Sequence, residues 1–70
     1  MAQSLNMFMD DYRDHSFAVD FTQHQHGITI RYRIDDLPWR ADSDHSWLDY
    51  EQAKKAGIAT CKAIIDRMAR

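Results

Sequence analysis

The sequence predicts an α+β domain in which a β-hairpin, with a possible third strand, is covered by one long C-terminal helix. From Phe17 to Ile34, apolar and polar residues alternate on both sides of His26-Gly27, as they do in a half-buried hairpin. From Tyr50 to about Met68, apolar residues recur instead at the helical period. Because a chain of 70 residues is short for more than one core, we expect a single domain over residues 1–70.

The N-terminal segment is predicted to form a short helix. Its apolar residues fall at helical spacing after Ser4, a residue type that often caps helix N-termini: Leu5, Phe8, Met9 and Tyr12. A helix this short is unstable alone in water, so we expect it to dock on the rest of the domain or on a second chain.

His26-Gly27 is predicted to form the tight turn of the hairpin. This turn aligns the two strands so that one face is apolar and the other face pairs polar residues with arginines. The predicted opposite pairs are Val19 with Ile34, Asp20 with Arg33, Phe21 with Tyr32 and Thr22 with Arg31.

The second strand should end before Pro38, because proline lacks a backbone N–H and disfavours a regular continuation at the preceding residue. A loop to about Asp44 and a short third strand over residues 45–48 are expected next. Asp49 and Gln52 then have the spacing of a capping box, which predicts that the helix begins here.

The predicted helix is apolar on the face that should cover the hairpin and has a stripe of small residues on its back. The apolar face contains Tyr50, Ala53, Gly57, Ile58, Cys61, Ile64, Ile65 and Met68, and the stripe contains Ala56, Ala59 and Ala63. The helix is longer than a hairpin can cover, and a single cysteine excludes an internal disulfide. We therefore predict a homodimer, in which a second copy contacts the alanine stripe or widens the sheet at its edge; for the stripe, the alternative is that alanine is simply the best helix former.

Composition and motifs argue against several classes of protein. The net charge of −2 lacks the basic excess of a typical nucleic-acid-binding domain. No long apolar run or N-terminal leader pattern is present, so we expect a cytoplasmic protein without a membrane span. Cys61 falls on the apolar helix face without a base placed beside it, and no glycine-rich phosphate loop occurs. We expect neither enzyme activity nor a cofactor.

Our leading hypothesis is a small protein-interaction module that binds a larger basic partner, as small inhibitors or regulators of phage and mobile-element type do. It rests on an aspartate-rich segment after the hairpin, whose candidate partner-binding residues are Asp35, Asp36, Asp42 and Asp44. Such a cluster of carboxylates would attract a basic protein surface.

Two alternatives use other residues. A nucleic-acid-binding accessory protein would contact phosphates and stack a base with Arg31, Arg33, Trp39 and Arg40. A metal-stabilised fold would use three imidazoles, those of His24, His26 and His45. In our leading hypothesis no metal is bound.

Residues 46–53, Ser-Trp-Leu-Asp-Tyr-Glu-Gln-Ala, lead from a strand into a capped helix behind a hairpin. This corner resembles small β-β-β-α modules such as the arm-binding domains of phage integrases. Those domains are more basic than this chain, and no binding residue is carried over from them.

Overall fold

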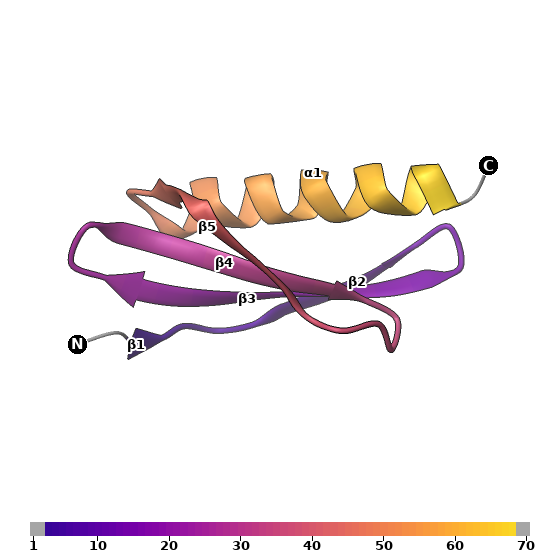
Figure 1. Cartoon of the computed structure of the whole chain (residues 1–70), viewed down its shortest axis with the longest axis horizontal. Coiled ribbons are helices and arrows are strands. Elements are labelled where there is room, and N and C mark those ends of the chain that lie inside the picture. The colour runs from indigo at the N-terminus through magenta and orange to yellow at the C-terminus, as the bar shows by residue number, and fades with distance from the viewer. Residues whose placement is uncertain (1–2, 69–70) are drawn as a thin grey trace.

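An antiparallel sheet covered on one face by a single helix makes up the computed structural model, which describes residues 3–68 (Figure 1). Its elements are β1 (Gln3–Ser4), β2 (Phe8–Tyr12), β3 (His15–His24), β4 (Gly27–Ile34), β5 (Arg40–Trp47) and α1 (Tyr50–Met68). β3 and β4 form the centre of the sheet, with β1 and β2 along one edge and β5 along the other. The predicted α+β class is confirmed.

The predicted N-terminal helix is wrong, because this segment forms strands along the free edge of β3. Phe8 pairs with Val19 and Tyr12 pairs with His15, and the Leu5 N–H donates to the Phe21 carbonyl oxygen at 3.1 Å. A helix of so few residues has little stability of its own, whereas an unpaired strand edge offers a row of backbone hydrogen bonds. Pairing with β3 therefore prevails over the helical spacing of the apolar residues.

The β2–β3 connection is a tight turn at Arg13 and Asp14. Both residues have left-handed backbones, with φ of 51° and 65°, and they join the opposed residues Tyr12 and His15. Positive φ at both central residues is what a two-residue hairpin needs to follow the twist of its strands.

The predicted register of the main hairpin is wrong by two residues. His24 pairs with Gly27, so Gln25 and His26 form the turn, and Phe21 faces Ile30 rather than Tyr32. A shift of two residues leaves each side chain on its own face, and period-two alternation therefore fits both registers equally well.

Gly27 serves the packing of the sheet rather than the turn. Its φ is +144°, and a Cβ atom built there would lie 2.9 Å from the Trp47 carbonyl oxygen. Glycine is thus required where β5 passes close to the start of β4.

The predicted loop to Asp44 is also wrong, because β5 already begins at Arg40. Arg40 pairs with Tyr32, Asp42 pairs with Ile30 and Trp47 pairs with Ile28. More residues separate Asp42 from Trp47 than separate their partners, so β5 bulges between them. This irregularity hides the strand from any search for strict alternation.

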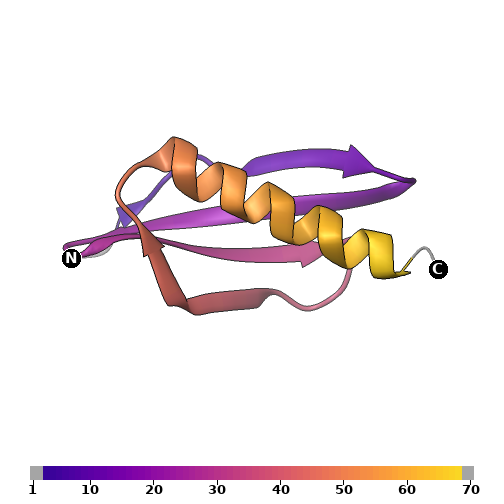
Figure 2. The same ribbon diagram turned by 90° about the horizontal axis from the view of Figure 1, so that it is seen from above.

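The C-terminal helix agrees with the prediction. The Gln52 N–H donates to Asp49 Oδ1 at 2.8 Å, which confirms the cap, and α1 then runs lengthwise over the sheet (Figure 2). Its inner face and the facing strands form the core: Phe17, Val19, Phe21, Ile28, Ile30, Ile34, Ala53, Cys61 and Ile65. Met68, placed on the apolar face by its spacing, is 42% exposed at the helix end.

The width of the sheet removes one of the reasons for predicting a dimer. The helix lies over more strands than a hairpin has, and Ala53, Gly57, Cys61 and Ile65 are buried within one chain. On the back of α1, Ala59 and Ala63 are exposed and Ala56 is half-buried. A homodimer through this stripe stays a prediction, which a melting temperature that rises with protein concentration would support.

Candidate functional site

The sheet has an open face on the side away from α1 (Figure 1). Residues that alternate with the buried Phe17, Val19 and Phe21 point to this side, and so do their cross-strand partners. The open face therefore carries Met9, Ala18, Asp20, Thr22, Thr29, Arg31 and Arg33. Within residues 3–68, no element covers it.

Trp39 lies against this face and is held by two arginines. The guanidinium carbons of Arg31 and Arg33 are 4.8 and 5.6 Å from the centre of its ring. Arg31 Nε donates to Asp20 Oδ2 at 2.8 Å, and Arg33 Nε donates to the Asp35 carbonyl oxygen at 3.0 Å. Both arginines therefore already have acceptors within the chain.

The fourth residue of the predicted nucleic-acid set, Arg40, does not join this group. It pairs with Tyr32, which itself pairs with the buried Val19, so Arg40 belongs to the side of the sheet that faces α1. There it lines a small hollow with Pro38 and Ile64.

An apolar hollow lies on the open face next to Trp39. Its volume is about 240 Å³, and its lining includes Met7, Met9, Ala18, Arg33, Asp35 and Trp39. Met9 is 67% exposed and Met7 is 48% exposed. Sequence reasoning missed both methionines, since it placed this segment in a helix; alternation from Phe8 to Tyr12 is too short to identify the strand on its own.

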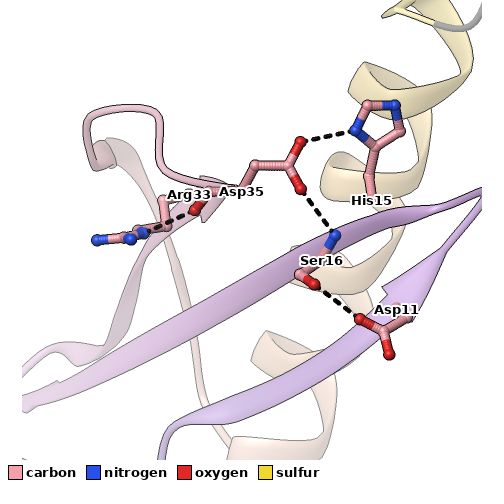
Figure 3. A network of polar contacts seen from close by, with 5 residues as sticks. All are labelled: Asp11, His15, Ser16, Arg33 and Asp35. Atoms are coloured by element: carbon pink, nitrogen blue, oxygen red, sulfur yellow. Dashed lines mark hydrogen bonds and ion pairs between the residues drawn. The ribbon is translucent and has the colours of Figure 1, made fainter.

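Asp35, which lines this hollow, joins the end of β4 to the start of β3. Figure 3 shows its contacts with His15 and Ser16. Its Oδ2 lies 2.7 Å from His15 Nδ1, its Oδ1 accepts from the Ser16 N–H at 2.9 Å, and its own N–H donates to the Ser16 carbonyl oxygen at 2.7 Å. The residue has a φ of 50°, a left-handed backbone that aspartate tolerates better than most residues.

The contacts of Asp35 favour its charged form. The hydrogen bond from His15, followed by that from the Ser16 N–H, holds the pKa of the Asp35 carboxyl below its ordinary value. Because the folded-state pKa is lowered, ionisation of Asp35 stabilises the fold above the unfolded pKa, and that contribution is lost as the pH falls through the folded pKa.

We expect Asp35 to titrate below about pH 3.9, the ordinary value for an aspartate. Carboxyl-carbon NMR titration measures this midpoint directly, and His15→Ala should raise it, because the largest cause of the shift is removed. A midpoint that is the same in both proteins would contradict the role of His15.

Four carboxylates surround this end of the sheet, and we call them the acidic end: Asp11, Asp14, Asp35 and Asp36. Asp11 Oδ1 accepts from the Ser16 hydroxyl at 2.8 Å (Figure 3), and Asp14 lies in the β2–β3 turn. Asp36 Oδ1 is 3.5 Å from Arg33 Nη2. Sequence reasoning missed Asp11 and Asp14, because only the pairing of β2 with β3 brings them to this place.

The predicted aspartate set is thus divided. Asp35 and Asp36 lie at the acidic end, whereas Asp42 and Asp44 lie along β5. Asp42 Oδ1 is 3.1 Å from His45 Nδ1 and accepts from the Asp44 N–H at 3.2 Å. Asp42 therefore contacts its neighbours Asp44 and His45 within β5, and neither aspartate belongs to the acidic end.

The three histidines of the alternative metal hypothesis are only partly brought together. The rings of His24 and His26 are stacked 5.2 Å apart at the main hairpin turn, and His24 Nε2 is 2.9 Å from the Thr29 hydroxyl oxygen. His45 instead contacts Asp42 on β5. Within residues 3–68, no group of three histidine, cysteine, aspartate or glutamate side chains is placed to hold a metal ion.

Cys61 is fully buried on the inner face of α1, and burial raises the pKa of its thiol to about 11. We expect a thiol reagent to modify the folded protein more than about a hundredfold more slowly than the urea-unfolded chain at neutral pH, because so little thiolate forms. The two rates are compared with a disulfide reagent that releases a coloured thiolate, whose absorbance reports the modification of Cys61. Equal rates would show that α1 opens readily.

The described part of the chain contains no helix long and apolar enough to cross a membrane.

Comparison with known proteins finds no matching family model, no matching curated protein and no matching solved structure.

Proposed function

We propose that this chain is a small non-enzymatic protein-interaction module that docks its partner on the apolar hollow of the open face. The observation that supports this most is the exposure of Met7 and Met9 beside Trp39 and Arg33. Methionine, tryptophan and arginine are enriched in the centres of protein interfaces. Exposed apolar side chains that line one concave surface are more informative than scattered ones.

The remainder of the open face suits the rim of such an interface. Thr22 and Thr29 face each other there, and Asp20 is paired with Arg31. Polar groups that already have partners inside the chain add specificity at a rim but little affinity. The apolar hollow is therefore the part of this face that would contribute most to binding.

Affinity capture with surface variants tests the proposal. A tagged wild-type chain, a Met9→Ser/Trp39→Ala variant and a Leu48→Ser control are incubated with a host lysate treated with nuclease. Leu48 is 87% exposed just before α1 and is not part of the lining of the hollow, so its variant controls for loss of an exposed apolar residue.

We expect wild type and the Leu48→Ser control to retain the same proteins. Met9→Ser/Trp39→Ala, which we call the hollow variant, should lose them. Circular dichroism melts show whether all three chains are folded. Proteins retained equally by the folded hollow variant would contradict the proposal. A role as an inhibitor or regulator would follow if a captured partner is less active in the complex.

Single-stranded nucleic acid is the second candidate partner, and the observation that favours it is the contact of Trp39 with two guanidinium groups. The chain carries a net charge of −2, and the acidic end beside Trp39 would repel phosphates. Fluorescence titration of wild type and Trp39→Phe with a mixed-sequence oligonucleotide at low salt distinguishes the two candidates. Quenching that depends on Trp39 and is abolished by salt would favour nucleic acid.

A further inference from the structure

We infer that the occupant of the apolar hollow is a basic and apolar segment of another protein: one bulky apolar side chain enters the hollow, and a neighbouring lysine or arginine reaches the acidic end. This inference rests on the proposed function, and it specifies the chemistry of the partner.

The hollow has room for one large side chain. Its volume of about 240 Å³ lies between Met9 and Trp39, with Ala18 beneath. Ala18 carries only a methyl group, so it leaves depth between its larger neighbours. Methionine side chains have several rotatable bonds and adapt to the shape of what they contact. A leucine, methionine or phenylalanine side chain would therefore be accommodated.

The surroundings of the hollow carry excess negative charge. Among residues 3–68, Asp36 is the only one of the four carboxylates with an arginine within ion-pair distance, at 3.5 Å, and Asp35 Oδ2 lies 2.7 Å from His15 Nδ1. Asp11 accepts from the neutral Ser16 hydroxyl, and the hydrogen bonds to Asp35 hold the pKa of the Asp35 carboxyl below its ordinary value. Arg13, the other arginine at this end, lies 2.9 Å from Asp66 on α1, which already neutralises it.

These charges favour a basic occupant over the other occupants of such a surface. An acidic peptide or a nucleic acid would bring further negative charge toward Asp35 and Asp36. In a symmetric dimer through this face, the same patch meets itself, so the two acidic ends would approach each other. A basic segment gains attraction from the same carboxylates.

Selection from a random peptide library on the immobilised chain tests the inference. Rounds of selection at low salt are followed by removal of peptides that also bind the Met9→Ser/Trp39→Ala variant. We expect the remaining peptides to combine a bulky apolar residue with a lysine or arginine a few positions away. Binding of one synthetic peptide is then measured by fluorescence anisotropy.

Two variants with the same change in net charge separate the acidic end from the rest of the surface. Asp14→Asn/Asp36→Asn should weaken the peptide about fivefold at low salt, because two nearby carboxylates are lost. Asparagine also tolerates the left-handed backbone of residue 14. Asp44→Asn/Glu51→Gln, which removes two charges elsewhere, should leave the affinity within about twofold.

The possible failures are distinguishable. Peptides that depend on the hollow but lack basic residues, or equal affinity for the two charge variants, would overturn the inference and leave the proposed function in place. If no peptide distinguishes wild type from the hollow variant, both are overturned. Sedimentation would also overturn the inference if the wild-type chain were a dimer and Met9→Ser/Trp39→Ala were a monomer, because a second copy would then occupy the hollow.

Discussion

Replacing Gly57 with alanine is expected to lower the free energy of unfolding by about 1–3 kcal/mol, the usual cost of overpacking a core. A Cβ atom at this position would lie 2.6 Å from Val19 Cγ1 and 3.2 Å from Val19 Cγ2. Val19 is fully buried in the central strand β3, and its branched side chain has little freedom to move. Helix propensity alone predicts the opposite sign, a gain of about 1 kcal/mol.

Urea denaturation of a small set of variants separates the two effects. Ala59→Gly, at an exposed position of the same helix, measures the propensity term without the contact. Val19→Ala removes the methyl groups that obstruct Gly57→Ala. The double variant should therefore lose less free energy of unfolding than the two single variants lose together. If Gly57→Ala proved more stable than wild type, α1 would have to shift readily away from β3.

The elements with local determinants could be predicted from the sequence. The helix has a capping aspartate, a long run at one period and good helix formers, all within residues 49–68, and its bounds in the structure match the prediction. The hairpin faces were also predictable, because alternation is a local property. Its register was not, since moving the turn by one position shifts the register by two residues and leaves both faces the same.

The N-terminal strands depend on a distant partner. Phe8 and Tyr12 are separated by four residues, a spacing that fits one face of a helix and one face of a strand alike. Only the free edge of β3 decides between the two, and the position of that edge is a consequence of the whole sheet. The spacing within this segment therefore permitted a helix, and only its pairing with β3 makes it form strands.

Some parts of the candidate site could likewise be predicted from the sequence and others could not. Arg31, Arg33 and Trp39 were identified from the sequence, and the structure brings them together. The apolar hollow was not, because it combines residues from 7–9, from β3 and from 33–39, which include the end of β4. A site assembled from three separate segments needs the sheet order before its members can be recognised as neighbours.

Replacing Phe21 with alanine is expected to cost about 3–5 kcal/mol, a large part of the stability of any small domain. Its side chain is fully inaccessible in the centre of the sheet, and its ring centre lies 4.7 Å from that of Tyr50 on α1. The Tyr50 hydroxyl in turn donates to the Asn6 carbonyl oxygen at 2.9 Å, so the same contact also supports the N-terminal edge of the sheet.

Thermal and urea melts followed by circular dichroism measure the loss, and two further variants keep the result interpretable. Phe21→Leu retains most of the volume and should lose only about 1.5 kcal/mol or less, so it stays folded if Phe21→Ala does not. Phe8→Ala, at the half-buried edge strand, removes the same side chain where part of it already contacts solvent, and should cost clearly less than Phe21→Ala. If Phe21→Ala cost no more than Phe8→Ala, the centre of the core would lie elsewhere than between β3 and the first turns of α1.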